Sequence, residues 1–397
     1  MRKLATGFAT TLTAAVAILS MTGGTATAAT TWTINPTCAT VTGPAALTYT
    51  TDEGTTLKAT STAPTPITYT SGLAALDSAN TLIAVQEVTV QSPWSLTKKV
   101  YRSTNAGCTW TAIHTLADGW MHKATAAKGG RAYLWSQGND DSVYRVSGTT
   151  VTKVVDPTAS TPVNGQIGLI GLGVDPANGL HVYAARKDGQ LFESTNGGNS
   201  WTPRGSAIAL SLNESVNEVE FDVKNPLHAV AGVSREGVWN TFDGGVTWNH
   251  VQTLDATTHP NSFYGVNINR IAVSPLDPNV VYAQGFDLSQ VDSDGDQGRQ
   301  IWRSTDGGRN FTAIVHHDPA TGVFLTNDVP MYPSPTDANV LYFVYADNYA
   351  NYGTDLFRYH AGTGALTHTH NQYHRLDEIV FNPKYPTTMY LALGLEP

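Results

Sequence analysis

The sequence has few cysteines, few charged side chains and no long apolar run beyond its first residues. Only Cys38 and Cys108 occur among 397 residues, and a thiolate metal centre needs more ligands than this pair supplies. Charged residues make up 14% of the chain, against about 25% in typical soluble proteins. After Met21 no apolar run approaches the roughly 18 residues of a membrane span. A thiolate cluster and a membrane-spanning protein are therefore disfavoured.

Basic residues are also in the minority. Lys and Arg number 23 against 32 Asp and Glu, so the net charge is −9. A nucleic-acid-binding surface or an anionic membrane surface requires clustered positive charge. We therefore expect neither nucleic acid nor membrane among the partners, and a monomeric protein.

Residues 1–28 have the pattern of a secretory signal peptide. Arg2 and Lys3 precede a weakly apolar run, and Ala26-Thr27-Ala28 matches an A-x-A cleavage site. Removal of this segment takes away two basic residues and no acidic ones, so the remaining charge is 21 − 32 = −11. The sequence thus predicts one exported domain over residues 29–397. In such a chain the two cysteines most simply form one disulfide, Cys38–Cys108.

What the sequence has instead is glycine, 36 residues of it, much of it in a recurring octet. Four good copies and one worn copy share a hydroxyl residue, then Asp or Asn two positions on, then Gly, and end in an aromatic or apolar residue. The copies are Ser103–Trp110, Ser194–Trp201, Thr241–Trp248, Ser304–Phe311 and the worn Thr50–Leu57.

The octet predicts a tight hairpin turn between two strands. The side-chain oxygens of Asp52, Asn105, Asn196, Asp243 and Asp306 should accept hydrogen bonds from backbone N–H groups two or three residues on. Glycine supplies the positive φ that the reversal needs, and the last residue packs on the sheet. The octet resembles the Asp-box (BNR repeat) of sialidases and related β-propellers, which implies a structural role for its carboxylate.

A second hairpin alternates with the octets along the chain. Apolar strands end in a proline turn, and seven residues beyond the proline an aromatic or valine recurs, as in Pro176 with Tyr183 and Pro275 with Tyr282. Seven such hairpins begin near residues 73, 124, 172, 219, 271, 329 and 379. Octet-type hairpins follow the first six, and the worn octet at 50–57 completes the seventh if the ring closes. The sequence predicts an all-β, seven-bladed β-propeller with four-stranded antiparallel blades, the last closed by both chain ends. Six blades with an N-terminal extension is the alternative.

Long aromatic loops should share the face opposite the octets. Aromatic and arginine side chains on a rigid rim are typical of protein or carbohydrate contacts. The alternative is that several fold inward and cover the strand ends. The predicted binding face comprises Trp94, Trp120, His122, His259, Phe263, Tyr264, Tyr349, Tyr352, Tyr373, His374 and Arg375.

Two further clusters raise the question of a metal. Asp292, Asp294 and Asp296 alternate beside glycine as in the start of a calcium loop. The twelfth position holds Arg303, so an EF-hand is excluded, and calcium binding competes with a solvated acidic turn. His368, His370 and His374 have spacing that zinc could use, but exposed loop histidines are the simpler interpretation. We expect no obligatory cofactor, with calcium the one candidate.

A sialidase-like hydrolase is the alternative function, because sialidases carry the Asp-box. That chemistry needs three arginines, a Tyr nucleophile with a Glu partner and an acidic Asp. Arg270 and Arg375 precede innermost strands, and Tyr264 and Glu378 could be drafted as the nucleophilic pair. Two arginines are one too few, so no catalytic residues are assigned.

The mature chain as a whole resembles the dispase autolysis-inducing family of streptomycetes. The resemblance rests on the signal peptide, seven blades with Asp-boxes such as Ser304–Phe311, few cysteines and acidic balance. It implies a non-enzymatic extracellular protein that engages neutral metalloproteases of the thermolysin type and provokes their autolysis. It also implies a substrate of secreted transglutaminase, for which Gln297, Gln300 and Gln372 are the candidate glutamines.

Overall fold

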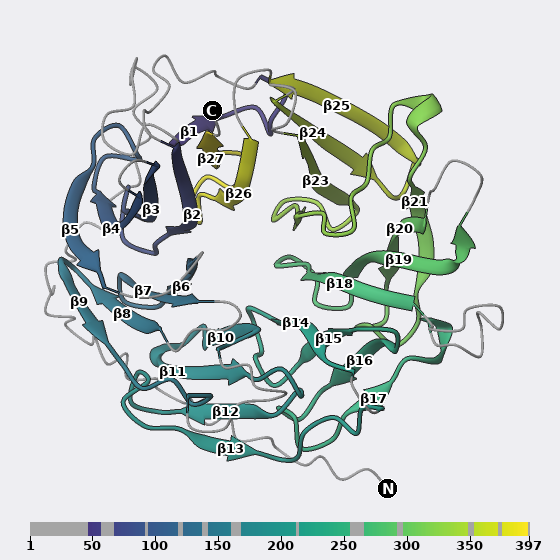
Figure 1. Cartoon of the computed structure of the whole chain (residues 1–397), viewed down its shortest axis with the longest axis horizontal. Helices are drawn as coiled ribbons and strands as arrows, with labels where there is room; N and C mark the ends of the chain where they lie inside the picture. Colours follow the sequence, from purple (N-terminus) through teal and green to yellow (C-terminus); the bar gives the residue numbers. More distant parts are fainter. Residues whose placement is uncertain are drawn as a thin grey trace, which may run out of the picture. The chain divides into compact units, whose positions relative to one another are not determined.

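Strands arranged as blades around a central axis make up the protein (Figure 1). The computed structural model describes residues 47–56, 67–91, 94–117, 122–136, 142–159, 168–211, 214–254, 266–291, 297–347, 353–371 and 375–395. The signal-peptide prediction and the domain boundary at 28/29 lie outside these residues and stay predictions. The predicted seven-bladed, antiparallel propeller is confirmed.

Each blade runs outward from an inner strand at the axis. Blade 1 contains β2 (Ile67–Ala75), β3 (Leu82–Gln91), β4 (Trp94–Ser103) and β5 (Thr111–Leu116); blade 2 contains β6 (His122–Ala127), β7 (Arg131–Ser136), β8 (Val143–Ser147) and β9 (Thr150–Lys153); blade 3 contains β10 (Gly171–Asp175), β11 (Asn178–Ala185), β12 (Leu191–Ser194) and β13 (Thr202–Arg204). Blade 4 contains β14 (Val216–Phe221), β15 (Ala229–Val233), β16 (Gly237–Thr241) and β17 (Asn249–His250); blade 5 contains β18 (Val266–Val273), β19 (Val281–Val291), β20 (Gln297–Ser304) and β21 (Thr312–His316); blade 6 contains β22 (Met331–Pro333), β23 (Val340–Asp347), β24 (Gly353–His360) and β25 (Ala365–Asn371). Among the described residues, blade 7 contains β26 (Arg375–Phe381), β27 (Met389–Leu395) and β1 (Leu47–Thr50).

Blade 7 is built from both ends of the described chain. Strand β1 pairs antiparallel with β27, with Tyr49 opposite Tyr390 and Thr50 opposite Met389, and β27 pairs on its other side with β26. The tyrosine rings of that register pair lie 6.5 Å apart between centroids. The predicted closure of the ring is confirmed, and the alternative of six blades with an N-terminal extension is wrong.

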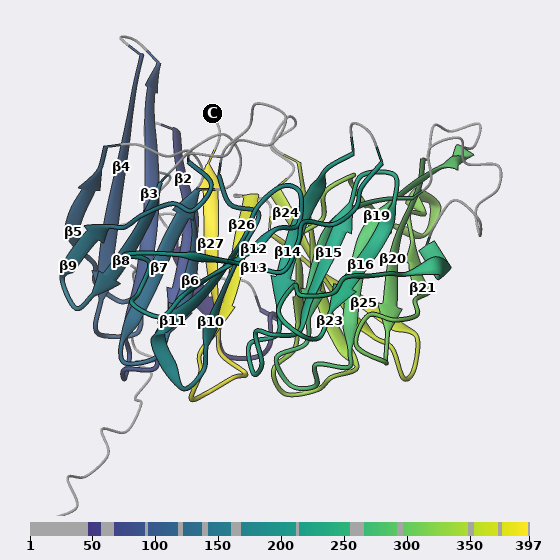
Figure 2. The same ribbon diagram turned by 90° about the horizontal axis from the view of Figure 1, so that it is seen from below.

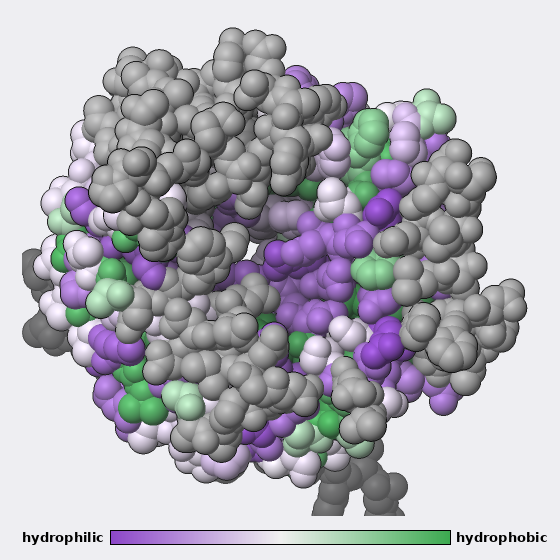
Figure 3. Space-filling view, viewed as in Figure 1, coloured by the Kyte–Doolittle hydropathy of each residue, from purple (hydrophilic) through white to green (hydrophobic). Residues whose placement is uncertain are grey.

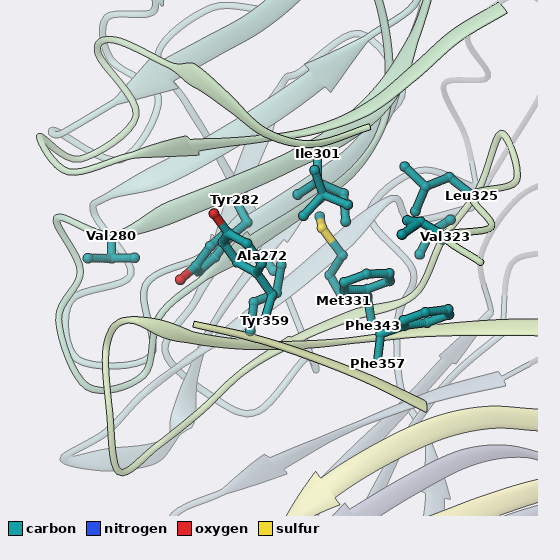
Figure 4. Close-up of a cluster of buried hydrophobic side chains, with 13 residues drawn as sticks. Ala272, Val280, Tyr282, Ile301, Val323, Leu325, Met331, Phe343, Phe357 and Tyr359 are labelled. Carbon is teal, nitrogen blue, oxygen red and sulfur yellow. The ribbon is translucent and has the colours of Figure 1, made fainter. Parts of the chain in front are cut away.

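The core lies between neighbouring blades, where the faces of their sheets meet. The aromatic residues seven positions past the turn prolines are buried as the pattern predicts, among them Tyr183, Tyr282 and Tyr342. Between blades 5 and 6 the buried side chains form one continuous cluster (Figure 4), in which the Phe343 and Phe357 rings stack with centroids 4.8 Å apart. Period-two burial of apolar residues thus determines which face of each strand points into the core.

The octets form the predicted turns, with one difference in their hydrogen bonding. In Thr241–Trp248, Asp243 Oδ1 accepts from the N–H of Thr247 at 2.9 Å, and the Thr241 hydroxyl accepts from the N–H of Gly245 at 2.9 Å. The accepted N–H lies four residues on, not only two or three, because the two residues after the Asp both have left-handed φ, 72° and 83° for Gly244 and Gly245. The equivalent four-residue bonds of Asp52, Asn105, Asn196 and Asp306 range from 2.9 to 3.1 Å.

Octet turns also hold neighbouring blades together. Arg145 of β8 donates to the Gly197 carbonyl in the octet of blade 3 at 2.8 Å, and Asn240 of β16 donates to the Gly308 carbonyl in the octet of blade 5 at 2.8 Å. Each bond satisfies a turn carbonyl with a side chain of the preceding blade. The octet is therefore a structural device that joins blades.

The two edges of the ring differ in their connections. The proline turns and the octet turns lie at one edge, hereafter the turn face, and the longer connections lie at the other, the loop face (Figure 2). The described helices are two short 3-10 turns, η1 (Gln252–Leu254) and η2 (Pro319–Thr321), and neither is long or apolar enough to cross a membrane.

Candidate functional site

The predicted binding face falls mostly outside the described side chains. Among the eleven residues proposed for it, the structure describes the side chain of His122, which is completely buried. Its Nδ1 atom lies 3.8 Å from Glu87 Oε1, and its ring lies 6.2 Å from the Tyr144 ring. The prediction of surface contact is wrong for His122, because the start of β6 turns its side chain into the core. Trp94 and Arg375 begin β4 and β26, but their side chains, and all of Trp120, His259, Phe263, Tyr264, Tyr349, Tyr352, Tyr373 and His374, lie outside the described residues.

The glutamine candidates are only partly placed. Gln300 is buried at 5% exposure, so its carboxamide is not available on this surface, and that prediction is wrong. It lies in β20 with strands β19 and β21 on either side. Gln297 begins the same strand without a described side chain, and Gln372 lies outside the described residues.

The metal and disulfide predictions are likewise beyond the described structure. Asp292, Asp294 and Asp296 lie outside it, so calcium binding there stays a prediction. Over the described ranges, no group of three or more His, Cys, Asp or Glu side chains is placed to hold a metal ion. His370 instead pairs with Asp355, with Nδ1 2.8 Å from Oδ1. Cys108 is buried in its octet, and its pairing with Cys38 stays a prediction because Cys38 is not described.

A central channel with a volume of 720 Å³ passes between the inner strands of all seven blades. Its walls combine apolar residues and prolines with charged groups. On the loop face, hydrophilic side chains gather beside a central hollow (Figure 3). The charged residues that line the channel are Lys123, Lys128, Asp175, Glu218, Glu220, Asp222, Arg270, Asp377 and Glu378. This channel is the candidate functional site, because concave, partly apolar cavities with a few converging polar groups are where proteins bind ligands.

One chain of alternating charges joins four parts of the ring. Glu218 of blade 4 receives the Lys123 ammonium of blade 2 at 2.9 Å and the Arg270 guanidinium of blade 5 at 3.0 Å. Arg270 also pairs with Asp328 of the connection to blade 6. The second oxygen of Glu218 accepts from the backbone N–H of Ile271 at 2.9 Å. Burial alone would raise the pKa of Glu218, but the positive charges of Lys123 and Arg270 and this hydrogen bond lower it to about 2.

Two other carboxyl groups of the channel have no cation of their own. Glu220 makes no hydrogen bond or ion pair within the described ranges, and burial and the nearby Glu218 raise its pKa to about 8. Glu378 of blade 7 accepts from the backbone N–H of Leu73 at 2.9 Å, yet burial raises its pKa to about 8. Both are mainly protonated near neutral pH and would ionise if a cation approached.

The described residues of the channel do not supply the full set of side chains that a sialidase-like hydrolase needs. Among the described residues that line the channel, the single arginine is Arg270. Its guanidinium is already paired with Glu218 and Asp328. Among the described residues, the tyrosine near Glu378 is Tyr332, and its hydroxyl lies 3.3 Å from the Asp377 carbonyl; Tyr264 lies outside the described residues. Burial and the neighbouring Glu378 raise the pKa of Tyr332 well above its ordinary range, which opposes its use as a phenolate nucleophile.

Glu378 was considered from the sequence only as a partner of Tyr264, and Glu218 and Glu220 were not predicted, although their spacing carried a signal. Val219 and Phe221 alternate as apolar residues that mark the strand, and Glu218 and Glu220 occupy the opposite face of the same strand. Acidic residues at period two in a buried strand indicate either a buried cation partner or a ligand site. Which of the two applies depends on residues of other blades, such as Lys123, that no local pattern connects.

Comparisons with known proteins agree with this architecture. The chain is 43% identical over 323 residues to the dispase autolysis-inducing protein of Streptomyces mobaraensis, covering 81% of this chain and 79% of that protein. Among solved structures, it resembles the GH74 xyloglucanase of Xanthomonas campestris with a TM-score of 0.56 and 18% identity, over 78% of this chain and 48% of the xyloglucanase. It also resembles YCF48 of Cyanidioschyzon merolae with a TM-score of 0.54 and 11% identity, over 83% of this chain and 97% of that one.

These comparisons differ in what they establish. No protein-family model matches the chain. The structural neighbours are too distant in sequence to show more than the fold, and this chain spans about half of the xyloglucanase. The identity to the streptomycete protein extends over most of both chains, and on that evidence this chain belongs to the family of the dispase autolysis-inducing protein.

Proposed function

We propose that this protein is an extracellular, non-enzymatic binding protein that engages neutral metalloproteases of the dispase or thermolysin type and promotes their autolysis. The observation that carries the proposal is the 43% identity to a protein named for inducing dispase autolysis. The alternatives among the structural neighbours rest on identities of 18% or less. A propeller suits this role because its blades hold both faces rigidly.

The physical mechanism is a shift in the conformational equilibrium of the protease. A ligand shifts such an equilibrium only if it binds one state more tightly than the other. A rigid face that fits the protease conformation with an exposed cleavable loop binds that conformation more tightly than the other. Its rigidity also means that it loses little conformational entropy on binding. A second protease molecule then cleaves that loop, and the propeller supplies no catalytic group.

Modification by a secreted transglutaminase is the second part of the proposal. Gln86, Gln284 and Gln300 are buried, and Gln190 donates to two backbone carbonyls. Gln252, in η1 between blades 4 and 5, is the exposed glutamine among those whose side chains are described. Together with Gln297 and Gln372 it is a candidate acyl-donor glutamine for the transglutaminase. Labelling with a fluorescent amine should fall in Gln252→Asn if this glutamine is used.

A protease assay tests the principal function. Thermolysin incubated with excess protein should disappear from a gel and lose activity faster than thermolysin alone. A thermolysin sample blocked by an active-site inhibitor should remain intact, since the cleavage is the protease's own. An unchanged half-life of thermolysin and of dispase at excess protein would contradict the proposal.

The same preparation tests the hydrolase alternative. Fluorogenic sialosides and xyloglucan oligosaccharides should remain uncleaved, because Arg270 is committed to Glu218 and Asp328. Turnover that disappears in Arg270→Gln while the variant retains the wild-type circular dichroism spectrum would establish a glycosidase instead.

A further inference from the structure

The outer strand of blade 6 differs from the outer strands of the other blades. Strand β25 (Ala365–Asn371) lies on the outside of its sheet (Figure 1) and pairs with β24 over seven consecutive residues without a bulge. Its sequence, ALTHTHN, contains no proline and no Lys, Arg, Asp or Glu. Within the described ranges, no strand pairs with its other edge. Such an edge presents unpaired backbone N–H and C=O groups to solvent.

Every other outer strand that the structure describes has a feature that discourages pairing with a further strand. Strands β5 and β21 each have a bulge, at Ile113 and Ile314. Strand β9 has four residues and includes Lys153, and β13 has three residues and includes Pro203. Strands β17 and β1 have two and four residues. Short length, bulges, charge and proline are the usual protections of an edge, and β25 has none of them.

The side chains of β25 fix the strand from both faces of its sheet. On one face the His368 ring lies beside the Phe357 ring, with centroids 5.5 Å apart. On the other face Thr369 Oγ1 lies 3.5 Å from the Thr55 carbonyl, in the worn octet of blade 7. A strand that is already held in an extended conformation loses little conformational entropy when another strand pairs with it.

We propose that β25 is a docking edge on which an extended segment of the metalloprotease pairs as a further strand of blade 6. This inference rests on the proposed function, which supplies the partner. The edge selects its occupant by main-chain chemistry, because an added strand must be extended and must offer its own N–H and C=O groups to those of β25. Alternate side chains of the added strand then lie beside Thr367 on one face and His368 on the other.

Capture of a strand gives a rigid propeller a way to promote autolysis. A folded protease offers an extended segment with unpaired main-chain groups when that part of its structure opens, and cleavage follows the population of the open form. A ligand that binds only the open form raises its population. The fixed edge of β25 therefore favours the state that a second protease molecule cuts. A second copy of this chain is the less suitable occupant, because both copies carry a net charge of −9 and repel each other.

Amide hydrogen exchange tests where the pairing occurs. Thermolysin blocked by an active-site inhibitor should slow exchange in peptides that cover β25, because pairing gives the outward N–H groups an acceptor. Peptides that cover β9 should exchange as in the free protein, since that edge is short and includes Lys153. Unchanged exchange over β25 in a complex that does form would overturn the inference. Slow exchange over β25 without thermolysin, together with a dimer in sedimentation, would assign the edge to a second copy and overturn it equally.

Charged substitutions on the edge test what the pairing contributes. Thr367 is exposed and lies opposite Arg358 of β24. Thr367→Lys and Thr367→Glu should each weaken binding of inhibitor-blocked thermolysin about tenfold, the loss expected at a central contact, since charge on an edge opposes pairing. Thr152 is the matched control, because it is exposed and lies opposite Arg145 at the same place in blade 2. Thr152→Lys and Thr152→Glu should bind within about twofold of wild type.

The two charges separate strand pairing from simple electrostatic attraction. Similar losses in Thr367→Lys and Thr367→Glu support an added strand. Opposite effects of the two variants, or affinities equal to those of the Thr152 controls, would overturn the inference while the proposed function stands. If wild type neither binds thermolysin nor shortens its half-life, the proposed function fails and this inference fails with it. A thermal melt of each variant shows that it is folded.

Discussion

Glu218 and Glu378 occupy equivalent places in blades 4 and 7 but have opposite pKa shifts. Each follows a β-bulge in an inner strand, and each accepts a hydrogen bond of 2.9 Å from a backbone N–H of the next blade. Burial raises the pKa of both, yet the pKa of Glu218 ends at about 2 and that of Glu378 at about 8. The difference comes from Lys123 and Arg270, which bond Glu218 directly and act on Glu378 only from a distance.

The two glutamates therefore have different roles within one channel. A carboxylate that holds two cations and a backbone amide has little capacity left for a ligand, and its removal exposes those partners. A protonated carboxyl with one backbone contact remains available to a cation that arrives from outside. The Glu218 carboxylate therefore fastens blades 2, 4 and 5 together, whereas Glu220 and Glu378 have no ion pair with a cation among the described residues.

The largest effect should come from Glu218→Gln. This change leaves Lys123 and Arg270 without their shared carboxylate, and breaking a buried ion pair costs about 3 kcal/mol or more. Urea unfolding at pH 7 should show this loss. Glu236→Gln, at a glutamate of blade 4 that accepts from the Ser211 N–H at 2.7 Å, is the control and should lose less than about 1 kcal/mol. Equal losses would mean that the charge chain does not fasten the blades.

A smaller effect, of the opposite sign at high pH, should come from Glu378→Gln. The folded-state pKa of about 8 lies above the ordinary value of 4.5, so the folded state holds a proton that the unfolded state releases between these values. The contribution of this carboxyl group to the free energy of unfolding is fully present below pH 4.5 and is lost as pH rises through 8. Between pH 6 and pH 8 the stability of Glu378→Gln should therefore rise by about 2 kcal/mol relative to wild type, since one pKa unit corresponds to about 1.4 kcal/mol. A stability difference that stays constant between these pH values would show that Glu378 is ionised in the folded protein.

Sequence predicted the scaffold more fully than the site, and the two glutamates show why. The octet around Asp243 and the turn between Pro275 and Tyr282 are local patterns, and each specifies a turn or a strand that the ring then repeats. The closure of β1 on β27 followed from counting those patterns. The pKa difference between Glu218 and Glu378 depends on Lys123, which is 95 residues away from Glu218, and such a contact exists only once the ring has closed.

The same limit explains the errors at individual residues. His122 and Gln300 have polar side chains of the kind that often lie on a surface, but each lies in a strand whose neighbours bury it. Local spacing therefore predicts blades, and the assembled ring decides which side chains face a partner.

The smallest effect should come from Lys123→Met, which moves Glu218 part of the way toward the state of Glu378. Arg270 and the Ile271 N–H remain on the carboxylate, so the loss at pH 7 should be about 1 kcal/mol. Because the folded-state pKa of Glu218 lies below 4.5, its stabilisation is present above that value and is lost as pH falls toward 2. Without Lys123 that pKa rises, and the acid-unfolding midpoint should move to higher pH. Lys128→Met is the control, since Lys128 is 59% exposed and its Nζ lies 4.0 Å from Asp77, and its midpoint should match wild type. A midpoint in Lys123→Met that also matches wild type would mean that Arg270 alone separates the two glutamates.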